Sequence, residues 1–351
     1  MKLYLLFATF FIFAIIAENA KSSLKIRMLP FAILILSWIA ATRDIIFWPD
    51  SLAYLSFFNE SPVLSNYSIG DKPASGYTDR GFYFLQVFMK TQSRNYIIYF
   101  FTVAAIGLTL VCDGLRKYAI FPLFGLAIYI SRFYMGRQLI QIRSGIAISI
   151  VFWAMQYVTQ RKLVEYTIAI YIASLFHISA WIAYPAYFLN MITFRKRHII
   201  WGVIISYVLA IYFTPAIRSI VADSASDIQG AENYVQKSNS YKSAGVGLSN
   251  PMVYYQTIIL LIFTFLEEKL KNVSAHYYTL RSGYFYSTCW LITLSSYAIL
   301  SGRGSTILAT YEILIIPMFS YVFNKRNRIV GYFTIGIFAL FWFYMNMTKR
   351  L

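Results

Sequence analysis

The chain has 351 residues, of which 59% are hydrophobic and only 13% charged, and its mean hydropathy is +0.58. A soluble domain carries about 25% charged residues, so this composition excludes a soluble fold and predicts an all-α polytopic integral membrane protein. A net charge of +17 would suggest nucleic acid as the partner of a soluble protein. Here the basic residues fall in short clusters between apolar runs, as in membrane proteins, and we expect no nucleic-acid partner.

Twelve apolar runs are long enough, or nearly so, to cross a bilayer, for which a helix needs about 20 residues. They lie at about 2–17, 28–42, 95–112, 118–136, 138–158, 163–176, 177–193, 199–215, 251–266, 277–300, 304–323 and 329–346. The first run could instead be a signal peptide, but a retained span agrees better with the distribution of charge. Segment 163–193 is interpreted as two spans that meet at Phe176-His177.

Six basic clusters lie between these runs, and with twelve spans all six fall on one side of the membrane. They are Lys21/Lys25/Arg27, Arg116/Lys117, Arg161/Lys162, Arg195/Lys196/Arg197, Lys269/Lys271 and Lys325/Arg326/Arg328. The positive-inside rule makes this side cytoplasmic. Both termini are then expected on the outer side of a single membrane domain that comprises 1–351.

Two long polar segments, 43–94 and 216–250, then fall on the outer face, where long loops usually carry the function. The first predicts two short helices. In WPDSLAYLSFF, Pro49 fits a first helical position and Asp50 the first turn. In TDRGFYFLQVFMK, Asp79 fits the cap of a helix whose apolar face could lie in the membrane interface. The second segment is rich in serine and glycine and is expected to be a mobile lid.

The charges within the spans or near their outer edges are mostly arginines and never lysines. They are Arg43, Arg132, Arg137, Arg143 and Arg303, with Arg80 in the outer loop and Arg281 nearer the inner side. An arginine in hydrocarbon costs roughly 2.5–3.5 kcal/mol on insertion scales. A guanidinium keeps its charge and donates two parallel hydrogen bonds to phosphate oxygens. The set therefore predicts an anionic ligand, a phosphate or a pyrophosphate.

Some of these arginines have structural alternatives. Arg43 and Arg137 could extend to the lipid headgroups. Arg143 lies about 9 Å deeper than Arg137 along an ideal helix, so it needs a partner or a water-filled cavity. A structural ion pair would use one of four acids, Asp44, Asp50, Asp79 or Glu312.

Two further segments carry candidate site residues. In SGRGSTILATYEILIIP, Arg303 stands between glycines at the expected outer start of a span, where helix N-termini favour anions. Tyr311 and Glu312 follow more deeply, and Glu312 is either the counter-ion of an arginine or an active acid. In SLFHISAW, His177 is either a hydrogen-bonded structural residue or a general base, because histidine titrates near neutral pH.

Five motifs in order resemble the EpsG-type family of membrane polysaccharide polymerases, which belongs with the Wzy-like polymerases of O-antigens, capsules and exopolysaccharides. The motifs are RDxxFWPDSLAY at 43–54, DRGFYFL at 79–85, RxxxxxRSGIA at 137–147, SLFHISA at 174–180 followed by Pro185, and the late arginine with YEILIIP at 311–317. Their order and approximate spacing match over most of the chain.

The resemblance implies a bacterial inner-membrane enzyme that works at the periplasmic face on repeat units carried by undecaprenyl diphosphate. The growing glycan would pass from its lipid diphosphate to the non-reducing end of a new unit. The implied architecture is similar to the GT-C class of glycosyltransferases, and it requires neither a metal nor another cofactor. The implied partners are the lipid-linked oligosaccharide, the growing chain, membrane lipids and a regulator of chain length. The sugars themselves do not carry over.

The resemblance and the arginine pattern converge on the diphosphate leaving group, whose growing negative charge fixed guanidiniums would stabilise. Arg137, Arg143 and Arg303 are expected at the diphosphate. Arg43, Arg80 and Tyr311 are expected as further substrate contacts. Asp50 or His177 could serve as the base for the acceptor hydroxyl, and Trp48, Tyr54 and Tyr77 could stack on sugars.

Three other functions remain as alternatives. A lipid-linked oligosaccharide flippase should show two related halves and charge near the bilayer midplane, whereas this chain places its polar mass on one face. An O-antigen ligase shares the chemistry of the polymerase, and only the motifs disfavour it. A polytopic O-acyltransferase would explain a histidine in the membrane but not the arginines.

Overall fold

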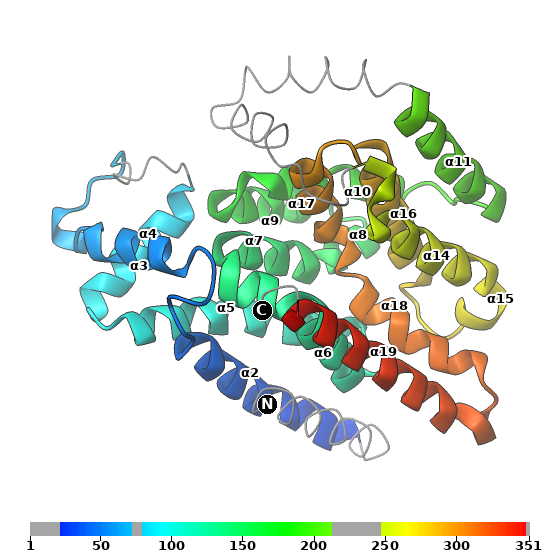
Figure 1. Ribbon diagram of the computed structural model, residues 1–351, viewed down its shortest axis with the longest axis horizontal. Helices are drawn as coiled ribbons and strands as arrows, with labels where there is room; N and C mark the ends of the chain where they lie inside the picture. Colours follow the sequence, from blue (N-terminus) through cyan, green and yellow to red (C-terminus); the bar gives the residue numbers. More distant parts are fainter. Residues whose placement is uncertain (1–21, 72–78, 213–246, 349–351) are drawn as a thin grey trace. The chain divides into compact units, whose positions relative to one another are not determined.

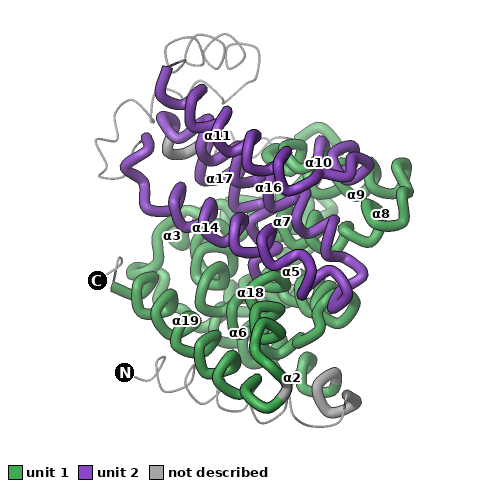
Figure 2. The backbone as a smooth tube through the Cα atoms, turned by 90° about the vertical axis from the view of Figure 1, so that its right-hand side faces the viewer, with its two compact units in different colours: residues 1–184, 313–351 green, residues 185–312 purple. Residues whose placement is uncertain are grey.

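The structure is a computed structural model that describes residues 22–71, 79–212 and 247–348 (Figure 1). Helices account for all regular secondary structure in these ranges, which confirms the predicted all-α class. Two compact units are present, unit 1 with residues 1–184 and 313–351 and unit 2 with residues 185–312 (Figure 2).

Unit 1 is built around the long helix α5 (Tyr96–Tyr118), against which α2, α4, α6 and α7 pack. The other helices of this unit are α2 (Ser22–Ala41), α3 (Ser51–Glu60), η1 (Leu64–Asn66), α4 (Arg80–Gln92), α6 (Pro122–Tyr129), the π-helix η2 (Ile130–Ile140), α7 (Ile142–Trp153), α8 (Met155–Thr159), α9 (Leu163–Phe176), η3 (Ile178–Ala183), η5 (Phe319–Val322), η6 (Lys325–Asn327) and α19 (Arg328–Thr348). Asn95 caps α5 by accepting a hydrogen bond from Ile97 N–H at 2.8 Å. Arg116 and Lys117 lie in its last turn, where the helix dipole favours cations.

Unit 2 is built around α16 (Tyr277–Thr293), against which α10, α11, α14 and α17 pack. Its other helices are α10 (Pro185–Leu189), α11 (Lys196–Tyr212), η4 (Gly247–Ser249), α14 (Pro251–Phe265), α15 (Glu267–Leu270) and α17 (Ala298–Ala309), and α18 (Glu312–Met318) begins at its last residue. Asn250 caps α14 through Met252 N–H at 3.0 Å, and Pro251 occupies the first helical position.

Three helices in the described part of the chain are long and apolar enough to cross a membrane. They are Tyr96–Tyr118, Ile142–Thr159 and Arg328–Thr348, and the bent pair Leu300–Ala309 with Glu312–Val322 would add a fourth if it counts as one span. Together with the composition, these helices support a membrane protein. The predicted number of twelve spans is not confirmed.

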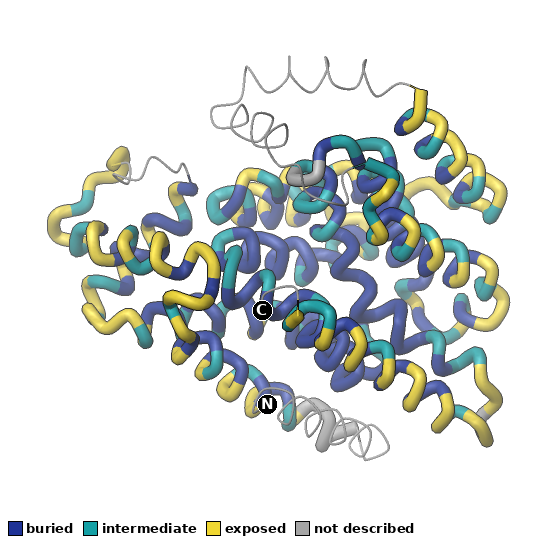
Figure 3. The backbone as a smooth tube through the Cα atoms, in the orientation of Figure 1, coloured by how far each residue is buried: buried dark blue, intermediate teal, exposed yellow. Residues whose placement is uncertain are grey.

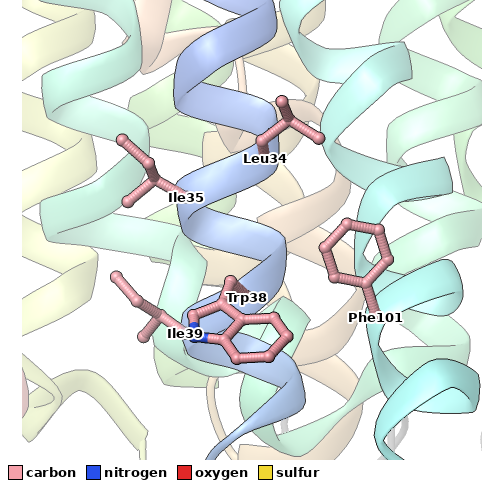
Figure 4. Close-up of a pocket in the computed structure, with 5 residues that line it drawn as sticks. All are labelled: Leu34, Ile35, Trp38, Ile39 and Phe101. Atoms are coloured by element: carbon pink, nitrogen blue, oxygen red, sulfur yellow. The ribbon is translucent and has the colours of Figure 1, made fainter.

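Figure 3 shows exposed stretches along α2 and α19, and many of the exposed side chains of these two helices are large and apolar. On α2, the side chains of Phe31, Leu34, Ile35 and Trp38 are each more than half exposed. An apolar groove of about 460 Å³ lies between α2 and Phe101 of α5 (Figure 4). The described residues that line this groove are all apolar, so it suits a hydrocarbon chain rather than a reacting group.

Several predicted boundaries are confirmed and others are corrected. The division at Phe176-His177 is confirmed, because α9 ends at Phe176. The run 304–323 is divided, because α17 ends at Ala309 and α18 begins at Glu312. Pro49 was wrongly expected at the first helical position, since α3 begins two residues later at Ser51. The predicted span 2–17 and nearly all of the predicted lid 216–250 lie outside the described residues.

Candidate functional site

One end of unit 1 gathers most of the predicted site residues. The start of α3 reaches the end of η2 there, with Ser51 Oγ donating a hydrogen bond to the Leu139 carbonyl at 3.4 Å. The start of α4 reaches α7 through an ion pair between Asp79 and Arg143. The same turn of α4 lies on the end of α9, where a Cβ on Gly81 would be only 2.8 Å from Leu175 Cβ.

Arg143 is paired with Asp79, one of the four acids considered from the sequence. Its Nη1 donates to Asp79 Oδ2, and its guanidinium carbon lies 5.9 Å from the centre of the Tyr54 ring. Asp79 is the residue before α4, as predicted, but its carboxylate makes no cap hydrogen bond because it is directed to Arg143. This ion pair agrees with a structural role for Arg143, and it agrees equally with a role in which Asp79 orients the guanidinium to bind phosphate.

The carboxyl of Asp79 has a raised pKa. Burial is the largest cause, and the positive charge and hydrogen bond of Arg143 oppose it. A raised pKa means that the folded protein holds this proton more tightly than the unfolded chain. The stability that Asp79 contributes is therefore fully present below its unfolded pKa and is lost as pH rises through its folded pKa.

We expect the melting temperature of wild type to exceed that of Asp79→Asn most at a pH of about 4 and below, near the unfolded pKa of an aspartate. The difference should shrink as pH rises through the raised pKa of Asp79, because asparagine does not titrate. Thermal unfolding of the purified protein across this range measures the difference. A difference that grows with pH would instead show that the attraction of Arg143 outweighs burial.

Arg137 lies in the π-helix η2, near its carboxyl end. The π-type hydrogen bond from Gln141 N–H to the Gly136 carbonyl at 2.8 Å closes this helix. The Arg137 side chain is 5% exposed, and its guanidinium carbon lies 4.1 Å from the centre of the Phe133 ring. π-Helical turns are rare and often occur at functional sites. The sequence analysis missed this helix, because no residue pattern distinguishes it from an α-helix.

Arg43 lies two residues after the end of α2 and is 7% exposed. Its Nη1 donates hydrogen bonds to the carbonyls of Gln138 and Leu139, at 2.8 and 3.0 Å. Arg43 was predicted as a substrate contact, and these hydrogen bonds do not test that prediction. They show that Arg43 also binds the backbone of η2, which its position in the sequence did not indicate.

Asp50 immediately precedes α3 and is exposed. Its φ of 62° places it in the left-handed region, which aspartate tolerates better than most residues. Its carboxylate makes no cap hydrogen bond to the helix. The structure thus places a solvent-accessible carboxylate next to Ser51, at the same end of unit 1 as Arg137.

His177 connects α9 to η3 and is 7% exposed. Its Nδ1 accepts from Ser179 N–H at 3.3 Å and lies 2.7 Å from Ser179 Oγ. In a neutral imidazole whose Nδ1 accepts, the proton is on Nε2. This arrangement matches the structural interpretation of His177 more closely than the role of a base.

Unit 2 contains three further residues considered from the sequence. Arg303 lies within α17 rather than at its start, so the predicted helix N-terminus is absent at this residue. Tyr311 is 3% exposed and lies so close to Gly283 that a Cβ there would overlap its ring. Glu312 is fully buried, and both carboxylate oxygens accept from tyrosines, Tyr255 at 3.0 Å and Tyr284 at 2.9 Å.

Arg80, Trp48, Tyr54 and Tyr77 remain from the predicted set, and Tyr54 lies beside Arg143. Arg80 is exposed at the first position of α4. Trp48 and Tyr54 are 8% and 4% exposed, so little of either ring is accessible to a sugar. Tyr77 lies outside the described residues.

Arg132 and Arg281 have partners within their own units. The Arg132 guanidinium carbon lies 4.3 Å from the Trp342 ring centre in unit 1. In unit 2, Arg281 donates to Glu267 at 2.8 Å and to the Phe194 carbonyl at 2.6 Å.

Sequence reasoning also missed a buried polar contact beneath the site. Gln86 of α4 is fully buried, and its Nε2 donates to the Tyr99 hydroxyl of α5 at 3.1 Å. A glutamine within the apolar stretch FYFLQVFM was the available signal. The contact helps to attach the outer segment 43–94 to the helices beneath it.

A protein-family model described as the EpsG family matches residues 26–350. The match covers nearly the whole chain, including both units. No curated protein and no solved structure matches the chain.

Proposed function

The chain belongs to the EpsG family of polysaccharide polymerases, and from this premise we propose that it joins oligosaccharide repeat units carried by undecaprenyl diphosphate. The reaction would take place at the periplasmic face of the bacterial inner membrane, in the synthesis of an O-antigen, capsule or exopolysaccharide. The observation that carries the proposal is the family match over 26–350, which places every candidate site residue within the matched region.

The charges at the end of unit 1 support a lipid-diphosphate donor. Arg137 and Arg143 lie on either side of the η2–α7 turn, and Gly145 brings the backbone of α7 against the Arg137 carbonyl. Two guanidiniums held by rigid backbone can stabilise the negative charge that grows on a departing diphosphate. Arg80 is a further candidate contact for phosphate or glycan. Arg303 and Tyr311 belong to unit 2 and remain candidates from the sequence.

The transfer step needs a base but no redox chemistry. A hydroxyl of the acceptor sugar attacks the anomeric carbon of the donor glycan and forms the new glycosidic bond. The bond between that carbon and the diphosphate oxygen breaks, and undecaprenyl diphosphate leaves with the electron pair. The hydroxyl proton passes to a carboxylate, for which we propose Asp50, because its exposed side chain is not engaged in capping α3.

Asp50→Asn is expected to lower the rate of transfer by about 10²-fold or more, the usual contribution of general base catalysis, with the KM for the donor nearly unchanged. Asparagine tolerates the left-handed backbone at this position, so the fold should be retained. The assay is chain extension by the purified protein on lipid-linked units extracted from a deletion strain. Asp50→Gly should behave like Asp50→Asn, whereas wild-type rates in both would exclude this carboxylate.

His177→Gln is the matched comparison. If His177 is structural, this variant loses thermal stability while its remaining folded fraction retains the rate of transfer. If the folded fraction of His177→Gln loses the rate and Asp50→Asn does not, the base is His177.

The purified protein also tests the proposed function itself. With lipid-linked repeat units as the substrate and no nucleotide sugar, it should produce a ladder of longer glycans. It should also release one undecaprenyl diphosphate for each linkage formed. Movement of units across a vesicle membrane without new linkages would support a flippase instead.

A further inference from the structure

The carbonyl end of η2 accepts two hydrogen bonds from Arg43, which is distant in the sequence. Arg43 Nη1 donates to the carbonyls of Gln138 and Leu139, at 2.8 and 3.0 Å. The last carbonyls of a helix lack partners within the helix and carry its negative pole. A cation at this position therefore both satisfies the carbonyls and is attracted by the dipole.

The Leu139 carbonyl also accepts a hydrogen bond from the first residue of α3. Ser51 Oγ donates to the same oxygen at 3.4 Å. Asp50 directly precedes Ser51, and Arg137 lies two residues before Leu139. One peptide group thus connects the proposed base to the segment that carries a proposed diphosphate ligand.

The surroundings of Arg43 hold its guanidinium in one position and leave little of it accessible to a ligand. Its guanidinium carbon lies 3.8 Å from the centre of the Phe100 ring, and only 7% of the residue is exposed. Burial lowers the pKa of Arg43 to about 10, and nearby Tyr99, Tyr134 and Tyr54 oppose this shift. The side chain therefore remains charged at neutral pH while it is packed against an aromatic ring.

We propose that Arg43 is a positioning residue for the transfer site, not a ligand of the diphosphate. It fixes the end of η2, and Ser51 of α3 donates to the same Leu139 carbonyl, so that Arg43 sets the spacing between Arg137 and Asp50. This role rests on the proposed function.

The contact between Arg43 and the two carbonyls of η2 is one that a lysine at this position could also make. One nitrogen, Nη1, makes both carbonyl bonds. A lysine ammonium has three donors on a flexible stem and can replace such a point contact, whereas it cannot replace a bidentate contact to phosphate. Arg43→Met removes the donor while keeping an unbranched side chain.

We expect Arg43→Met to lower kcat by about tenfold to a hundredfold, the order of loss when a site is displaced by about 1 Å. Arg43→Lys should recover kcat to within about threefold of wild type, as a point contact allows. The KM for the lipid-linked donor should remain nearly constant in both. The assay is chain extension by purified variants, with Arg94→Met as the control, because Arg94 is an exposed arginine of the same outer segment with no proposed contact to substrate.

Two outcomes would overturn the positioning role. One is an Arg43→Lys variant that is folded but as slow as Arg43→Met. The other is a rise in donor KM in both variants with kcat retained, as expected for a ligand of the diphosphate.

A second readout does not depend on activity. Spin labels at Leu52 of α3 and Gln141 after η2 should give a narrow distance distribution in wild type and Arg43→Lys, and a broader one in Arg43→Met. An unchanged distribution in Arg43→Met would contradict the positioning role. If wild type forms no glycan but the distributions behave as expected, the proposed function fails while the structural role of Arg43 stands.

Discussion

Arg143→Ala is expected to abolish long-chain glycan while the protein remains folded in the membrane. The variant removes the guanidinium of the second residue of α7, which pairs with Asp79 and lies beside Tyr54. Loss of one donor to the charge that develops in a transition state costs about 10²–10³ in rate. Arg143→Lys is expected to fail as well, because an ammonium lacks the planar fork that matches two phosphate oxygens. Glycan length on gels and the rate of chain extension measure both variants.

Arg116→Ala is the matched control, because Arg116 also pairs with an aspartate, Asp113 at 2.5 Å, but is 52% exposed near the end of α5. It should retain wild-type glycan, since exposed ion pairs contribute about 0–1 kcal/mol. Substantial activity in Arg143→Lys would rule out bidentate phosphate binding. Loss of folded protein in both Arg143 variants would assign the ion pair with Asp79 a structural role.

Gly145→Ala is expected to destabilise the protein and to abolish long-chain glycan. A Cβ on Gly145 would overlap the carbonyl group of Arg137, which belongs to the backbone and cannot change rotamer. Within a helix, alanine is otherwise more favourable than glycine by about 0.5–1 kcal/mol, so the loss would come from this contact. Forced overpacking costs about 1–3 kcal/mol of folding stability. To remove the overlap, η2 and α7 would have to move apart, which would displace Arg137 and Arg143. Melting temperature and glycan length measure the two effects.

Gly136→Ala is the control for this substitution, because a Cβ there would have no neighbouring atom within 4 Å. Its stability and glycan should resemble those of wild type. If Gly145→Ala is as stable and active as Gly136→Ala, the close approach of α7 to Arg137 does not exist in the working enzyme. If Gly145→Ala is destabilised but fully active, the spacing of the two arginines is not critical.

The residues at which several helices begin and end were largely predictable from the sequence. A polar residue or proline next to an apolar run identifies where the run begins or ends, and α9, α14 and α19 start and stop within a few residues of the predicted bounds. The break between Ala309 and Glu312 was missed, because the sequence ILATYEILIIP has neither glycine nor proline at the break. Pro49 was misplaced because proline is also favourable just before a helix cap, where its fixed φ suits a turn.

The partners of the charged residues could not be predicted to the same degree. Sequence reasoning recognised that Arg143 needed an acid or a cavity and named Asp79 among four possibilities, but choosing among them requires the packing of α4 on α7 and α9. Arg43 was assigned to the substrate because its targets, two backbone carbonyls of η2, have no side-chain signature. The same limit applies to the π-helix, which is defined by its hydrogen bonds.

The measurement that tests the proposed polymerase most directly is the glycan ladder of a strain deleted for this gene, with and without wild-type complementation. A polymerase predicts that deletion collapses the ladder to single repeat units on their normal carrier and that the wild-type chain restores it. Loss of even the single capped unit would contradict a polymerase and would place the protein at an earlier step, such as flipping, or at ligation.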